Sequence, residues 1–120
     1  MRQTSAPMPT FEQGAVIRVP FPYTDRPVRQ YRPTLVVSST GVGENQSLLW
    51  VLMITSAENR RWPGDVDVGE RHREMGLPAP SLVRTAKIAT IKGTQADQIG
   101  RLRGDILDEV LDNVGATLRR

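Results

Sequence analysis

The 120-residue sequence contains no cysteine and only one histidine, His72. The absence of cysteine excludes a disulfide framework, a thiolate nucleophile and a cysteine-based metal site. With one imidazole, neither a cluster of histidine metal ligands nor a Ser–His–Asp triad is expected. Any catalysis would then be free of metal and cofactor and poor in histidine. His72 lies in a charged loop and is expected to be solvated, although a loop histidine can also shuttle protons.

Long apolar runs are also absent, so no membrane span is expected. The first ten residues, MRQTSAPMPT, lack the apolar core of a signal peptide. We expect residues 1–10 to form a flexible polar arm and residues 11–120 to form one domain. A cytoplasmic location is expected, in agreement with the lack of cysteine.

Lysine is scarce: 14 of the 16 basic residues are arginine, and the net charge is +3. Codon usage explains this excess as well as function does, so the positions of the arginines are more informative than their number. Arg32, followed by Pro33, stands at the start of an apolar strand, where a charge is costly. Its planar guanidinium suits phosphate, but a salt bridge with a loop acid such as Asp25 is the alternative.

Several short segments have the apolar pattern of β-strands. The strand candidates are residues 15–21 (AVIRVPF), 34–39 (TLVVSS), 48–56 (LLWVLMITS) and 65–68 (DVDV), and then 81–86 (SLVRTA) and 87–91 (KIATI), which could form one bent strand. A proline-interrupted loop is predicted over residues 22–31. The third segment is apolar without a break from Leu48 to Ile54, which indicates a central strand covered on both faces or inside a barrel. Trp50 within it is expected to lie in the core.

Residues 104–118 show apolar positions at helical spacing: Leu107, Val110, Leu111, Val114 and Leu118. On its own this segment indicates a packing helix. Short strands with turn residues between them and one terminal helix predict a mainly β protein, a small and strongly bent barrel of five to seven strands.

The order of several motifs resembles a known family. GAVIRVPFPYTD, YRPTLVVSS, LWVLMITS, DVDV, GLPAPSLVRTAKIATI and IGRLRGDILDEVLDNV are similar to segments of the MazF/PemK (Kid) toxins of type II toxin–antitoxin systems. The similarity extends over about residues 11–118. It implies an SH3-like (CcdB/PemK-like) barrel, a homodimer and a metal-independent, sequence-specific endoribonuclease that cleaves single-stranded RNA. It also implies a cognate antitoxin whose acidic, disordered tail covers the RNA groove.

The resemblance implies a catalytic pair, Arg32 of the "RP" motif and Thr55 of the "TS" motif. Without it, a Thr at a strand end would be read as capping a backbone group. The sequence departs from the family at Ala15, where an Asp is common. It also has Ala86 where the Kid branch has an acid two residues after the arginine that matches Arg84, which favours the simpler Arg/Thr arrangement.

Further side chains are candidates for RNA binding through charge, hydrogen bonding or stacking on unpaired bases. They are Arg84, Ser56, Arg26, Arg29, Arg60, Arg61, Trp62 and Tyr23. Arg84 either places a second positive charge near the phosphate or pairs with Asp65 or Asp67. Trp62 either stacks on a base or packs within the protein, and each loop arginine could instead be merely solvated.

Two other functions remain open at this stage. One is a gyrase-inhibiting toxin like the related CcdB, which carries its target contacts on a C-terminal helix with an aromatic tail. This chain ends in GATLRR, without an aromatic residue. The other is a catalytically inert nucleic-acid-binding barrel, with which Ala15 and Ala86 are compatible.

Overall fold

The computed structural model describes residues 11–22 and 29–119 of the chain. Within these ranges the strands are β1 (Ala15–Pro22), β2 (Arg29–Val36), β3 (Leu48–Ser56), β4 (Val66–Asp67), β5 (Ser81–Lys92) and β6 (Asp97–Arg101), followed by helix α1 (Gly104–Leu118). Short 3-10 helices, η1 (Glu44–Gln46), η2 (Gly69–Arg73) and η3 (Gly93–Gln95), lie in the connections. The described strands form a six-stranded antiparallel sheet in the order β4–β5–β3–β2–β1–β6.

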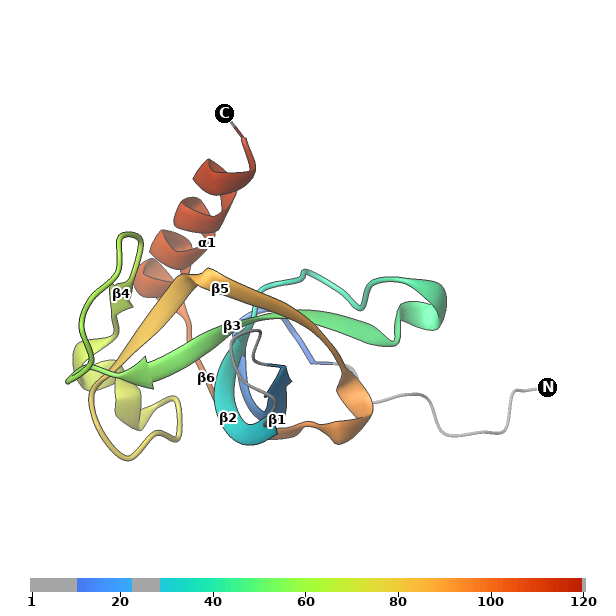
Figure 1. Cartoon of the computed structure of the whole chain (residues 1–120), viewed down its shortest axis with the longest axis horizontal. Coiled ribbons are helices and arrows are strands. Elements are labelled where there is room, and N and C mark those ends of the chain that lie inside the picture. Colours follow the sequence, from blue (N-terminus) through green and yellow to red (C-terminus); the bar gives the residue numbers. More distant parts are fainter. Residues whose placement is uncertain (1–10, 23–28, 120) are drawn as a thin grey trace.

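The sheet curls into a half-barrel, and α1 stands at one side of it, near β4 and β5 (Figure 1). This arrangement confirms the predicted fold class, a mainly β protein with a C-terminal helix. The predicted helix has the bounds of α1, because its apolar stripe packs against the sheet.

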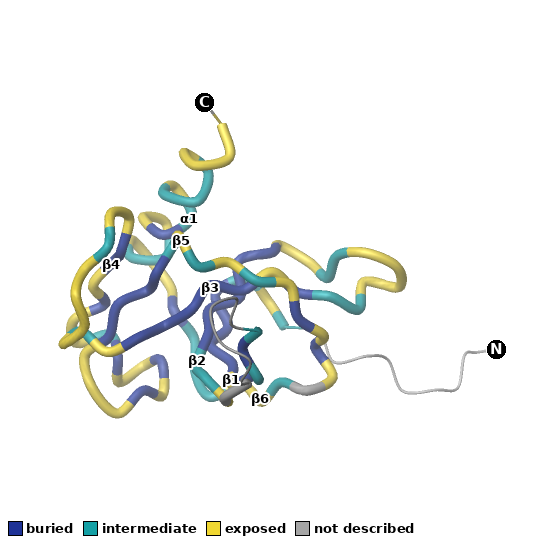
Figure 2. Tube along the Cα trace, viewed as in Figure 1, coloured by how far each residue is buried: buried dark blue, intermediate teal, exposed yellow. Residues whose placement is uncertain are grey.

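Strand β3 lies inside the sheet between β5 and β2, and most of its residues are buried (Figure 2). Its side chains alternate between two hydrophobic clusters: Leu52 and Ile54 join the one that α1 covers, and Leu49 and Val51 join the other. Successive strand residues point to opposite faces, so a strand covered on both faces reads as continuously apolar. The prediction of a central strand is therefore confirmed.

Of the two possibilities left open for residues 81–86 and 87–91, the structure has one bent strand, β5. Its pairing with β3 shifts abruptly, because Leu52 pairs with Ile88 while the next residue, Met53, pairs with Arg84. The intervening residues 85–87 form a bulge, and a bulge bends a strand and increases its twist. Figure 1 shows the resulting sharp turn in the middle of β5.

The predicted boundary between the first loop and the second strand is wrong. Strand β2 begins at Arg29 rather than at Thr34, and it ends at Val36. Its hairpin partner β1 supplies the reason, since pairs extend from Val16↔Leu35 to Pro22↔Arg29. This ladder places Arg32 and Pro33 within the strand instead of before it.

Two side chains are not where the sequence suggested. Trp50 was expected in the core, but it is 44% exposed, because it lies on the α1 side of the sheet beyond the part that the helix covers. His72 was expected to be solvated, yet it is buried within η2. Its Nδ1–H donates to the Gly69 carbonyl oxygen over 2.9 Å, which gives the ring a structural place in this loop.

Candidate functional site

The register of the sheet brings Arg32 and Thr55 to the same place. Strands β2 and β3 pair as Thr34↔Met53, Leu35↔Leu52 and Val36↔Val51. Continuing this antiparallel register by two residues puts Arg32 opposite Thr55. Residues opposite each other in an antiparallel pair project from the same face of the sheet. The middle of β2 and the end of β3 therefore each contribute a polar side chain to one spot.

A cavity of about 310 Å³ lies at that spot. Arg32, Thr55 and Ser56 line it from β2 and β3, together with Asn59. Its remaining wall is mostly apolar and includes Ile54, Pro33 and residues 77–81, which lead into β5 and include its first residue. The structure therefore brings together three of the residues selected from the sequence, and it adds Asn59, which was not selected.

Arg32 is half-buried, and its Nε is buried without a hydrogen-bond partner among the described residues. A buried donor without a partner costs about 1–3 kcal/mol, so such groups usually have a ligand or another role. The guanidinium carries a permanent positive charge and donors in a planar fork, which match the oxygens of a phosphate. The geometry at Arg32 is thus suited to an anion in the cavity.

Thr55 is 7% exposed, and its Oγ1 accepts a hydrogen bond from Asn59 Nδ2 over 2.6 Å. Ser56 Oγ accepts the Glu58 N–H over 3.1 Å, so this hydroxyl stabilises the turn that follows β3. Asn59 gave no sequence signal, since it is one polar residue in a polar turn. Its role depends on the folded turn, which bends its side chain back toward Thr55.

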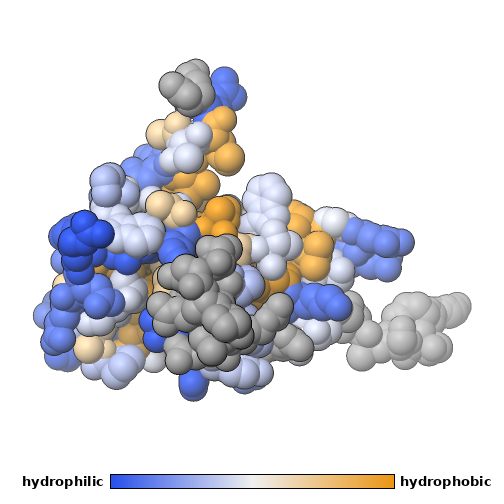
Figure 3. Space-filling view, viewed as in Figure 1, coloured by the Kyte–Doolittle hydropathy of each residue, from blue (hydrophilic) through white to orange (hydrophobic). Residues whose placement is uncertain are grey.

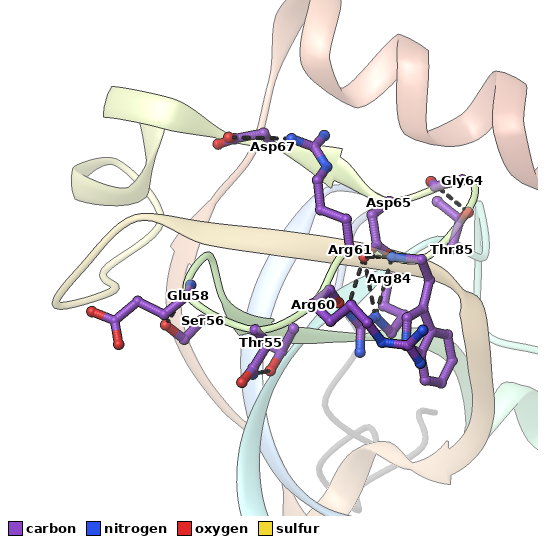
Figure 4. A network of polar contacts seen from close by, with 12 residues as sticks. Thr55, Ser56, Glu58, Arg60, Arg61, Gly64, Asp65, Asp67, Arg84 and Thr85 are labelled. Carbon is purple, nitrogen blue, oxygen red and sulfur yellow. Dashed lines mark hydrogen bonds and ion pairs between the residues drawn. The ribbon is translucent and has the colours of Figure 1, made fainter.

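Arg84 is 7% exposed and makes a bidentate ion pair with Asp65, whose side chain is fully buried. Its Nη2 donates to Asp65 Oδ2 over 2.9 Å and to the Arg60 carbonyl over 2.7 Å, and its Nε lies 3.2 Å from Asp65 Oδ1 (Figure 4). Asp65 Oδ2 also accepts the Trp62 N–H over 2.8 Å. Of the two alternatives drawn from the sequence, the pairing with Asp65 is present, and Arg84 anchors the loop between β3 and β4.

Trp62 and Arg61 lie on this anchored loop, as does the exposed Arg60. The Trp62 ring lies 4.1 Å below the Arg84 guanidinium carbon and 5.8 Å from Lys87 Nζ. Arg61 makes an exposed ion pair with Asp67 at 3.8 Å. These loop residues and Arg84 are not among the described residues that line the cavity.

The remaining candidates lie where little is described. Tyr23 and Arg26, and the alternative partner Asp25, are outside the described residues. Arg29 is described only by the position of its backbone at the start of β2.

No group of three or more His, Cys, Asp or Glu side chains in the described part of the chain could hold a metal ion. Within the same residues, no helix has the length and apolar character needed to cross a membrane.

The family described as "PemK-like, MazF-like toxin of type II toxin-antitoxin system" matches residues 12–119. A search of curated proteins finds no match. Among solved structures, a MazE–MazF structure from Deinococcus radiodurans has a TM-score of 0.68 at 21% identity, covering 93% of this chain and 96% of that one.

Two mycobacterial structures are similar at comparable levels. An endoribonuclease in complex with its cognate antitoxin, from a mycobacterial species, has a TM-score of 0.68 at 18% identity, covering 89% of this chain and 93% of that one. The Mycobacterium tuberculosis toxin MazF-mt6 has a TM-score of 0.60 at 22% identity, covering 86% and 95%. At these identities the likeness shows a shared fold.

Proposed function

Because the chain belongs to the PemK-like, MazF-like toxins of type II toxin–antitoxin systems, we propose that it is a sequence-specific endoribonuclease acting on single-stranded RNA in the cytoplasm. The observation that carries the proposal is the cavity that Arg32 of β2 and Thr55 of β3 both line. Both residues line this cavity, and Arg32 Nε is buried without a hydrogen-bond partner in the part of the chain that the structure describes.

The proposed reaction is an internal phosphoryl transfer. The RNA 2′-oxygen loses its proton and bonds to the adjacent phosphorus, the P–O5′ bond breaks, and the leaving 5′-oxygen takes up a proton. The products are a 2′,3′-cyclic phosphate and a 5′-hydroxyl. This chemistry uses a nucleophile that RNA itself supplies, so neither a cofactor nor a metal-bound water is required.

Arg32 is proposed to stabilise the negative charge that accumulates on the phosphorane, the largest contribution such a site can make. Pro33 restricts the Arg32 backbone to extended geometry, which keeps its side chain at the cavity. Thr55 is proposed to hydrogen-bond a phosphate oxygen. Arg60, Arg61 and Trp62 would then bind RNA outside the cavity, on the loop that Arg84 anchors.

The test is incubation of the purified protein with a long single-stranded RNA in EDTA. We expect fragments with 2′,3′-cyclic phosphate ends, and we expect Arg32→Ala to fold normally and cut at least ~10²-fold more slowly, the scale of losing one charge-stabilising group. Thermal unfolding of the variant checks its fold. Full activity of Arg32→Ala would contradict this mechanism.

The same assay separates the alternative functions. Uncut RNA with gyrase-dependent DNA breaks would indicate a gyrase-inhibiting toxin instead, and RNA binding without cleavage would indicate an inert nucleic-acid-binding barrel.

A cognate antitoxin is the proposed protein partner, because the similar structures include MazF with MazE and an endoribonuclease with its antitoxin. An acidic, disordered antitoxin tail would compete with RNA for Arg32 and the exposed arginines of the loop after β3. Opposite charge would speed and strengthen that contact, especially at low salt.

A homodimer is also proposed, and a large apolar groove between α1 and the sheet supports it. The groove has a volume of about 610 Å³ and is lined by Trp50, Ile88, Leu111 and Leu118, among others. Figure 3 shows hydrophobic surface extending from α1 toward the sheet. Trp50, Ile88 and Leu118 are 44%, 50% and 70% exposed, and such a patch on a small protein usually marks an interface.

A further inference from the structure

Asn59 contacts one member of the proposed catalytic pair, although nothing in the sequence pointed to it. Its side-chain Nδ2 donates to Thr55 Oγ1 over 2.6 Å, a short hydrogen bond for an amide and a hydroxyl. Both residues line the cavity that contains Arg32. Whatever Thr55 does in this cavity, Asn59 is placed to influence it.

The turn after β3 holds Asn59 in this position. The Asn59 N–H donates to the Ser56 carbonyl over 3.0 Å, which closes the turn. The Ala57 N–H donates to the Pro80 carbonyl over 3.0 Å, which ties the turn to the opposite wall of the cavity. On the far side, Arg84 Nη2 holds the carbonyl of the next residue, Arg60. These three hydrogen bonds anchor the backbone on both sides of Asn59.

The direction of the hydrogen bond determines what the Thr55 hydroxyl can offer. A hydroxyl has one hydrogen to donate and two lone pairs that accept. Since the Asn59 amide donates to Thr55 Oγ1, one lone pair is occupied and the hydroxyl hydrogen stays available. Thr55 is 7% exposed, and its free side is the cavity.

We propose that Asn59 is a positioning residue that sets the Thr55 hydroxyl as a hydrogen-bond donor into the cavity, toward a non-bridging oxygen of the RNA phosphate. This inference rests on the proposed endoribonuclease function. Asn59 does not exchange protons with the RNA in this scheme, because its amide hydrogen stays on nitrogen. Its contribution is to occupy one lone pair of Thr55 Oγ1, which orients the hydroxyl hydrogen away from Asn59.

The experiment compares single-turnover cleavage of one long single-stranded RNA by the full chain and four variants: Asn59→Ala, Asn59→Asp, Thr55→Val and Thr55→Val/Asn59→Ala. Asn59→Ala should slow cleavage about 5- to 10-fold, the scale of one hydrogen bond. Asn59→Asp should slow it further, because a carboxylate accepts the Thr55 hydrogen instead of donating to it. In the Thr55→Val background, Asn59→Ala should change the rate less than twofold.

Glu58→Ala is the matched control, because Glu58 is exposed in the same turn and its side chain does not line the cavity. It should cleave at the wild-type rate. Binding of a 2′-O-methyl RNA, which cannot react, should be the same for Asn59→Ala and wild type, since the lost contact is internal to the protein. A purely structural role would instead lower affinity, rate and thermal stability together.

Three outcomes would overturn the inference. Wild-type cleavage by Asn59→Ala would show that the contact is idle. An equal loss in the presence and absence of the Thr55 hydroxyl would show that Asn59 acts on the RNA directly. The third outcome is spectroscopic. The NMR signals of the Asn59 side-chain amide protons should differ between wild type and Thr55→Val, and unchanged signals would show that the hydrogen bond does not form.

The NMR result also separates this inference from the proposed function. If the amide signals shift but the wild-type protein leaves RNA intact, the proposed function fails, and the catalytic meaning of the contact fails with it.

Discussion

At the scale of single residues, the surroundings of Arg84 and Arg32 differ in how far each guanidinium is satisfied within the protein. The Arg84 guanidinium donates hydrogen bonds to the Asp65 carboxylate and the Arg60 carbonyl. Arg32, in contrast, has a buried Nε without a hydrogen-bond partner among the described residues. A satisfied ion pair stabilises a loop, and an unsatisfied donor beside a cavity is available for a ligand. Arg84 therefore has a structural role, and the proposed role of Arg32 is to bind an anion.

Arg84→Met should lower the free energy of unfolding by about 3–5 kcal/mol, because it leaves the Asp65 carboxylate buried without its partner. Urea unfolding measures the loss. Arg61→Met is the control: its ion pair with Asp67 is exposed and should contribute about 0–1 kcal/mol. A fully stable Arg84→Met protein that no longer cuts RNA would contradict the structural role and favour direct RNA contact.

At the scale of elements, the segment between η2 and β5 builds one wall of the cavity and depends on a close backbone approach. Gly76 has a φ of +73°, and a Cβ there would lie 2.1 Å from the Ile99 carbonyl oxygen in β6. Leu77, the next residue, lines the cavity. The position of the cavity wall is thus coupled to the docking of this segment on β6.

Gly76→Ala should destabilise the protein by more than the roughly 1–2 kcal/mol that a left-handed conformation alone costs, because the new methyl group also collides with backbone. Gly69→Ala is a matched control, since Gly69 has a φ of +54° but nothing within 4 Å of the added Cβ. Denaturant unfolding of the two variants measures the difference. Equal losses would mean that the contact with β6 is not tight.

At the scale of the whole molecule, the cavity and the apolar groove are separate features with separate linings. The cavity combines a guanidinium and hydroxyls, while the groove presents exposed hydrophobic side chains from β3, β5 and α1. One is suited to an anion and the other to an apolar surface. The proposed RNA cleavage and dimerisation can therefore be altered independently.

Ile88→Glu should weaken the proposed dimer by about 100-fold or more, because a carboxylate buried without a partner costs several kcal/mol. Sedimentation velocity over a range of protein concentrations measures the association. Gln98→Glu adds the same charge at an exposed position of β6 outside the groove and should leave association unchanged. A wild-type protein that is monomeric at all concentrations would contradict the dimer itself.

The sequence by itself determined the elements whose signals are local. The bounds of β3 and α1 were predicted as the structure has them, because a run of apolar residues and a helical stripe depend only on neighbours in the chain. The order of motifs was sufficient to predict the family and the fold class. The Arg32–Thr55 pair was selected through that resemblance, and it stays a prediction until cleavage is measured.

Only the tertiary structure decided the facts that depend on one element meeting another. Pairing with β1 extended β2 back to Arg29, the limited reach of α1 left Trp50 exposed, and the buried Asp65 took Arg84 as its partner. The contact of Asn59 with Thr55 belongs to the same class. The physical reason is that strand register, helix coverage and turn closure bring distant parts of the chain together. The distance between two residues in space cannot be read from their separation along the sequence.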